Sequence, residues 1–203
     1  FRVTIFGSAR IKKEDPRYKQ IKTLAKMIGE QGIDIITGGG PGIMAAANSG
    51  HVLGRKKSKI TTHSIGLGIK LPHEQAFNQS VGIKKSFNRF SNRLDNFMLL
   101  SNVVVVAPGG VGTLLELFYT WQLMQVKHIC NVPIILLGDM WDDLLKWLEK
   151  DPLRKKFFDK KDFDLLIHAK NSSEAIKIIN HAHTEYLKGN PKHCLNYKKY
   201  QIH

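Results

Sequence analysis

The 203-residue sequence is poor in the features that mark membrane, disulfide-rich and metal-binding proteins. It has no run of about 18 apolar residues, which excludes a membrane-spanning helix on length. Two cysteines, Cys130 and Cys194, are too few for a disulfide framework, and a reducing cytoplasm is the expected location. The histidines show no zinc-ligand spacing and no H-E-x-x-H motif, so we expect neither a catalytic metal nor a cofactor.

Acidic residues are scarce as well, since 31 Lys and Arg stand against 17 Asp and Glu. Nine of the basic residues fall in the segment from Arg55 to Arg93, whose one acid is Glu74. A positive field there attracts phosphorylated ligands, although the run 55–59 alone is typical of a solvated loop. Nucleic-acid binding is the competing interpretation. Helix-turn-helix, zinc-finger and RNP patterns are missing, however, so only non-specific phosphate attraction is expected.

What the sequence does contain is an alternation of strand and helix patterns. Apolar runs predict strands at 2–6, 33–36, 64–69, 103–107 and 133–137. Helix patterns begin near residues 16, 43, 88, 112, 141 and 173. Strands that alternate with helices imply right-handed crossovers and one parallel sheet. We therefore predict an α/β fold, a single Rossmann-like, doubly wound domain at 1–188, followed by a basic C-terminal tail at 189–203.

Two of the predicted strands end in glycine-rich turns that lead into helices. The run 103–107 enters Pro108-Gly109-Gly110-Val111-Gly112-Thr113, and the run 33–36 enters Thr37-Gly38-Gly39-Gly40-Pro41-Gly42. Such turns aim backbone N–H groups and a helix N-terminus at one point, which suits a phosphate. Glu116 follows one helical turn after the first of these motifs. A tight turn without a ligand is the alternative interpretation.

The segment 108–116 resembles the PGGxGTxxE signature of the LOG family, phosphoribohydrolases once widely mislabelled as lysine decarboxylases. Members carry an arginine fifteen residues before the proline of this motif, and Arg93 stands fifteen residues before Pro108. The turn at 38–44 is similar to the family's GGGxxGxM element. The resemblance covers roughly residues 3 to 150, with departures at Arg10 and Leu94.

The resemblance implies hydrolysis of the N-glycosidic bond of a nucleoside 5′-monophosphate, which gives free base and ribose 5-phosphate. It makes Arg93 and Glu116 catalytic. It places in the nucleotide site Gly7, Ser8, Gly38, Gly39, Gly40, Gly109, Gly110, Gly112 and Thr113. Candidates for contact with the base or ribose are Met44, His73, Glu74 and Arg89. His73 and Glu74 could equally hold a loop, and Met44 could belong to the core.

Cleavage of this bond builds positive charge on the ribose. A fixed carboxylate stabilises such a charge, which is the role expected for Glu116, and its place near a helix N-terminus predicts that it stays ionised. Arg93 is too basic to accept a proton and would clamp phosphate, sugar hydroxyls or Glu116. A surface ion pair is the alternative role for Arg93. No general acid for the departing base stands out.

The sequence leaves the base open, since cytokinin-type, purine and pyrimidine nucleotides are all admissible. It also leaves a second class of function, a non-catalytic carrier of a nucleotide or phosphorylated cofactor, as in the molybdenum-cofactor carriers that this fold resembles. Glu116 and Arg93 together favour the enzyme. Lysine decarboxylation is rejected, because no lysine stands in a recognisable pyridoxal-phosphate setting. Relatives are mostly homodimers, and the apolar helix 114–126 has enough surface to pack on a partner subunit.

Overall fold

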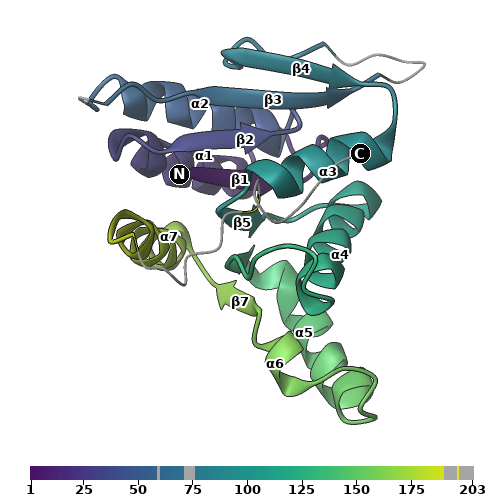
Figure 1. Ribbon diagram of the computed structural model, residues 1–203. Helices are drawn as coiled ribbons and strands as arrows, with labels where there is room; N and C mark the ends of the chain where they lie inside the picture. Colours follow the sequence, from purple (N-terminus) through teal and green to yellow (C-terminus); the bar gives the residue numbers. More distant parts are fainter. Residues whose placement is uncertain (59, 71–75, 190–195, 197–203) are drawn as a thin grey trace.

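The computed structural model describes residues 1–58, 60–70, 76–189 and 196, and its centre is a sheet of parallel strands (Figure 1). The strands over these residues are β1 (Arg2–Phe6), β2 (Asp34–Thr37), β3 (Ser64–Ile69), β4 (Ile83–Phe87), β5 (Val103–Val106), β6 (Ile134–Leu137) and β7 (Leu166–Ala169). Their spatial order is β4-β3-β2-β1-β5-β6-β7. The chain moves outward from β1 through β4, then returns to the other side of β1 for β5. This reversal confirms the doubly wound α/β fold and puts a topological switch point between β1 and β5.

Helices cover both faces of the sheet. One face carries α1 (Pro16–Glu30), α2 (Ile43–Arg55) and α7 (Ser172–Leu187), and the other carries α3 (Phe90–Leu100), α4 (Val111–Gln125) and α5 (Asp142–Leu148). Shorter elements between β6 and β7 are η1 (Asp139–Trp141), η2 (Glu149–Leu153) and α6 (Lys160–Phe163). The six longer helices begin within two residues of the predicted positions. Asp15 is the N-cap of α1, because its side chain accepts a hydrogen bond from the backbone N–H of Arg17.

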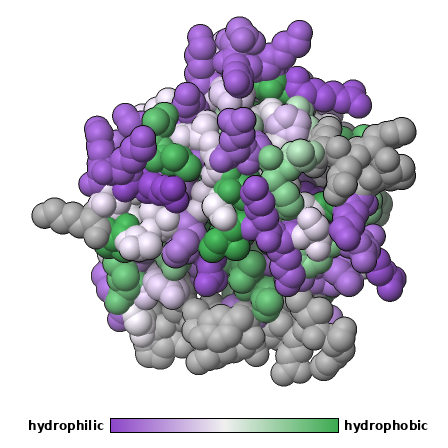
Figure 2. Space-filling model, turned by 90° about the horizontal axis from the view of Figure 1, so that it is seen from above, coloured by the Kyte–Doolittle hydropathy of each residue, from purple (hydrophilic) through white to green (hydrophobic). Residues whose placement is uncertain are grey.

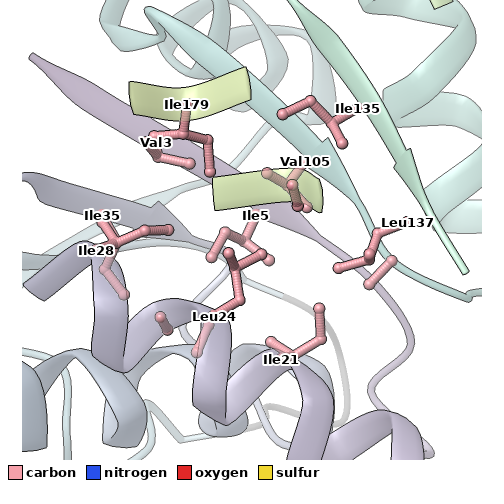
Figure 3. Packing of buried hydrophobic residues seen from close by; sticks show 14 of the residues in the cluster. Val3, Ile5, Ile21, Leu24, Ile28, Ile35, Val105, Ile135, Leu137 and Ile179 are labelled. Carbon is pink, nitrogen blue, oxygen red and sulfur yellow. The ribbon is translucent and has the colours of Figure 1, made fainter. Parts of the chain in front are cut away.

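The two faces of the sheet bury two hydrophobic cores. Figure 3 shows the first, in which α1 and α7 pack apolar side chains onto β1, β2, β5 and β6. The second lies under α3 and α4, where the rings of Phe6 and Phe97 meet edge to face with 5.0 Å between their centroids. Each fully buried Leu, Ile or Phe stabilises the fold by about 1.5–3 kcal/mol. The strand ends that carry the site are therefore held in a rigid frame.

The sequence patterns do not predict β4 and β7, which are the two edge strands. β4 reads Ile-Lys-Lys-Ser-Phe, and of its side chains only Phe87 is buried. Lysines on an edge strand discourage pairing with another chain, but they also break the apolar run that identifies a strand. Figure 2 views the molecule from this side, and hydrophilic side chains stand out over much of the face.

Most of the predicted tail, residues 190–195 and 197–203, lies outside the described residues. Asn196 is described and buried. Its side-chain oxygen accepts a hydrogen bond from the backbone N–H of Cys130 at 2.7 Å, and its amide nitrogen donates to the carbonyls of Met98 and Ser101. One tail residue thus packs into the domain, while the boundary at residue 189 stays a prediction. None of the described helices is long and apolar enough to cross a membrane.

Candidate functional site

The loops after β1, β2 and β5 meet at the carboxyl edge of the sheet, beside the switch point. Backbone hydrogen bonds join them, because the N–H of Ser8 donates to the carbonyl of Pro108 at 3.1 Å. The carbonyl of Ser8 in turn accepts from the N–H of Ile43 at 2.9 Å. The three turns therefore form one platform, at the place where doubly wound sheets bind ligands.

Close packing explains some of the glycines in this platform, and open space explains others. Gly42 has φ of +63°, and a Cβ there would overlap the carbonyl of Ser8. A Cβ on Gly109 would overlap the side chain of Thr113. By contrast, nothing lies within 4 Å of a Cβ built on Gly110 or Gly112. The first pair of glycines shapes the loops, and the second pair leaves room in front of α4.

A cavity of about 620 Å³ lies over the platform, a size typical of small-molecule sites. Of the predicted residues it brings together Gly7, Ser8, Gly38, Met44, Arg93, Gly110, Gly112, Thr113 and Glu116. The start of α4 forms part of its wall. The N-cap Gly110 gives α4 no side-chain capping hydrogen bond, so the N–H groups of the first turn are suited to an anion.

A smaller compartment of about 120 Å³ adjoins the main cavity. The two share Gly38, Met44 and Arg93 in their linings. Gly39 and Gly40 line the compartment and not the main cavity. The rest of its wall comes from β3, β4 and the segment before β4, through Gly68, Ile69, Ala76, Phe77 and Ser86.

Of the predicted residues that the structure describes, two line neither space. Gly109 packs against Thr113 instead. Arg89 is exposed at the N-cap of α3. His73 and Glu74 lie outside the described residues.

Arg10 and Phe77 are among the lining residues that sequence reasoning misses. Arg10 lines the main cavity, and its position directly after the Gly7-Ser8-Ala9 turn was a signal available in the sequence. Phe77 lines the compartment, and no local pattern marks it.

Arg93 and Glu116 meet between the two spaces. Nη2 of Arg93 lies 3.4 Å from Oε1 of Glu116, and the two side chains are only 11% and 12% exposed. Nε of Arg93 donates to the carbonyl of Leu67 at 2.7 Å. The guanidinium also lies over the ring of Phe97, 5.0 Å from its centroid. The pair is therefore buried and fixed, so the alternative of a surface ion pair is wrong.

Burial changes the protonation of Glu116. Desolvation raises its pKa from 4.5 to about 7, and the neighbouring Arg93 opposes only part of this rise. Burial also lowers the pKa of Arg93. Burial therefore works against the prediction that Glu116 stays ionised, because it favours the neutral acid in the neutral pH range. The favourable field of a helix N-terminus fades within the first turn, and Glu116 lies on the buried face of α4 beyond it.

Within the described part of the chain, no group of three His, Cys, Asp or Glu side chains is placed to hold a metal ion. The arrangement instead offers three chemical environments in a row. Backbone donors at the start of α4 suit an anion, the Arg93–Glu116 pair can stabilise charge or exchange a proton, and the compartment beyond it is partly apolar.

This fold and site define a class of doubly wound α/β proteins that frame a ligand cavity with glycine-rich turns. Within that class, the chain belongs to the LOG family, because the family model described as "Possible lysine decarboxylase" matches residues 44–179. This match confirms the resemblance found in the sequence motifs. None of the curated proteins matches the chain.

Solved structures with the same fold include two that are described as binding or carrying the molybdenum cofactor. The molybdenum cofactor binding protein from Rippkaea orientalis is 24% identical, with 89% of this chain and 94% of that chain covered and a TM-score of 0.61. The Moco carrier protein from Chlamydomonas reinhardtii is 23% identical, with coverages of 91% and 98% and a TM-score of 0.62. At these identities the likeness shows the fold alone.

Proposed function

We propose that the protein hydrolyses the N-glycosidic bond of a nucleoside 5′-monophosphate to free base and ribose 5-phosphate. The observation that carries this proposal is the buried Arg93–Glu116 pair beside the open start of α4. Thr113 and Glu116 are three residues apart on this helix, which corresponds to about 4.5 Å along its axis. A nucleotide whose phosphate binds the first turn can therefore bring its ribose to Glu116.

In this proposal Glu116 acts on the charge that forms as the bond breaks. The ribose becomes positive at C1′, and an ionised carboxylate fixed beside it stabilises that charge. Water supplies the hydroxyl that joins C1′ and the proton that ends on the base. Arg93 orients the carboxylate and, through its contacts with Leu67 and Phe97, stays in place itself. The ionised fraction of Glu116 grows as the pH rises through about 7.

The test is incubation with AMP, GMP, CMP, UMP and isopentenyladenosine monophosphate without added metal, followed by chromatography for base and ribose 5-phosphate. We expect release by the wild type and a loss of about 100-fold or more in Glu116→Gln. Glu14→Gln is the matched control, because Glu14 is exposed and lies outside both spaces. If every nucleotide stays intact, the hydrolase proposal fails.

A second candidate function is carriage of a phosphorylated cofactor without catalysis. It is favoured by the two solved structures, which are described as binding or carrying the molybdenum cofactor. A carrier would use the start of α4 but would gain nothing from Glu116, whose ionised form repels an anion. Nucleotide binding without turnover, and equal or tighter in Glu116→Gln, is the result that favours the carrier.

We further propose that the protein is a homodimer through α4. Val111, Leu115 and Phe118 are 85%, 46% and 38% exposed and lie at i, i+4 and i+7 on one helix face. Exposed apolar surface of this kind marks protein contacts. We expect light scattering to give a dimer mass for the wild type and a monomer mass for Leu115→Glu. A monomer mass for the wild type at every concentration would contradict this.

A further inference from the structure

The smaller compartment, defined above by its lining of Gly38–Gly40, Met44, Gly68, Ile69, Ala76, Phe77, Ser86 and Arg93, has the dimensions of a specificity pocket. We propose that it receives the departing base, that it accepts a single six-membered ring, and that Phe77 sets this limit. Pyrimidine nucleotides are then the preferred substrates. The inference rests on the proposed hydrolase function and names its substrate class.

The Arg93–Glu116 pair indicates which part of a bound nucleotide the compartment receives. Arg93 lines both spaces and lies 3.4 Å from Glu116, so C1′ of a bound nucleotide belongs at their boundary. The start of α4, where the phosphate binds, lies on the main-cavity side. With phosphate and C1′ placed in this way, the base extends to the other side, toward the ends of β3 and β4.

The volume of the compartment decides which base fits. It measures about 120 Å³, whereas an apolar cavity of about 150 Å³ holds one benzene molecule. The compartment is therefore closer in size to one six-membered ring than to a fused purine ring system, whose second ring has no room inside it. Met44 and Phe77 supply apolar surface, and the hydroxyl of Ser86 can both donate and accept a hydrogen bond to ring substituents.

Contacts behind the ring of Phe77 prevent it from moving away from the compartment to admit a larger base. Its ring lies against bare glycine backbone, because a Cβ on Gly68 would come within 2.7 Å of it and one on Gly39 would overlap it. The next residue, Asn78, ties the segment to the glycine turn. Its backbone N–H donates to the carbonyl of Gly39 at 2.8 Å, and its side chain donates to the carbonyl of Gly40 at 2.9 Å.

The experiment compares kcat/KM for CMP, UMP, AMP and GMP in the wild type, Phe77→Leu and Phe77→Ala. We expect the wild type to favour the pyrimidine nucleotides by about tenfold or more. The ratio of kcat/KM for pyrimidine nucleotides to kcat/KM for purine nucleotides is expected to fall in Phe77→Leu. It is expected to fall further, or to reverse, in Phe77→Ala, because each change enlarges the compartment. Purines preferred by the wild type, or a ratio that neither variant moves, would overturn the inference.

Binding to the Glu116→Gln protein, measured by calorimetry, separates this inference from the hydrolase proposal. Ribose 5-phosphate has no base, so adding Phe77→Ala should leave its affinity within about twofold while the preference for CMP over AMP falls. If the affinity for ribose 5-phosphate falls equally, Phe77 acts on the platform and the inference is overturned. If no nucleotide is hydrolysed but the base preference depends on Phe77, the compartment stands and the hydrolase proposal falls.

Discussion

Replacing Glu116 by glutamine is expected to stabilise the protein at alkaline pH. Burial raises the pKa of Glu116 from 4.5 to about 7, so its ionised form is less favourable in the folded chain than in the unfolded one. The stabilisation from the neutral carboxyl is fully present below pH 4.5 and is lost as the pH rises through about 7. Glutamine has a similar shape and cannot ionise, so it keeps that stabilisation at every pH.

The size of the effect follows from the two pKa values. Each pKa unit corresponds to about 1.4 kcal/mol, so complete ionisation of Glu116 costs about 3 kcal/mol of unfolding free energy. Part of this cost is already present at pH 5, because the carboxyl of the unfolded chain is largely ionised there. Between pH 5 and pH 8.5 the advantage of the glutamine variant is therefore expected to grow by about 2 to 3 kcal/mol. This is a large share of the 5–15 kcal/mol that is typical of a domain.

Urea unfolding of both proteins at both pH values measures this growth, and comparing the two differences cancels effects that do not depend on pH. Glu14→Gln removes an exposed carboxyl and is expected to change the free energy of unfolding by less than about 0.5 kcal/mol at either pH. The reasoning is refuted if the glutamine variant gains nothing between pH 5 and 8.5. A loss at pH 8.5 would show that attraction to Arg93 outweighs desolvation.

Further predictions concern the glycines, the tail and the pH dependence of activity. Gly112→Ala projects a methyl group into open space, so calorimetry is expected to show ribose 5-phosphate binding weakened about tenfold while urea unfolding shows no loss of stability. Gly42→Ala forces a Cβ onto the carbonyl of Ser8 at a positive φ and is expected to lose at least about 2 kcal/mol in the same unfolding assay. Asn196→Ala leaves buried backbone groups unpaired, which is expected to cost about 1–3 kcal/mol of unfolding free energy. If ionised Glu116 is the working form, kcat/KM rises with pH and levels off above about 7, and a profile that falls over this range would contradict its role.

The sequence predicts the central strands because their side chains are buried on both faces. Val103 to Val106 of β5 are fully buried, so the strand reads as an unbroken apolar run. The edge strands β4 and β7 carry polar residues, and only the assembled sheet gives them a pairing partner. The glycine turns are also predictable, since their sequences carry their own conformational requirement.

The electrostatics of the site are not predictable in this way. The shift in the pKa of Glu116 depends on which face of α4 is covered, and that is settled by packing against α3 rather than by position along the helix. Phe77 likewise becomes a wall of the compartment only because glycines from β3 and from the turn after β2 lie beneath it. Both features arise from contacts between segments distant in sequence, which local patterns do not contain.

The protonation of Glu116 bears directly on the choice between hydrolase and carrier. A carboxyl buried next to an anion site lowers the stability of the fold above pH 7. When it is ionised, it also repels a phosphorylated ligand before the reaction begins. Both costs are offset when positive charge forms on the ligand beside it, since that charge favours the ionised acid in the transition state alone. A carrier never reaches such a state. In a carrier, Glu116 would therefore lower the stability of the fold and the affinity for the ligand without any compensating gain. A glutamine variant that is more stable, binds nucleotide at least as well and has lost hydrolysis would therefore identify Glu116 as a residue retained for catalysis.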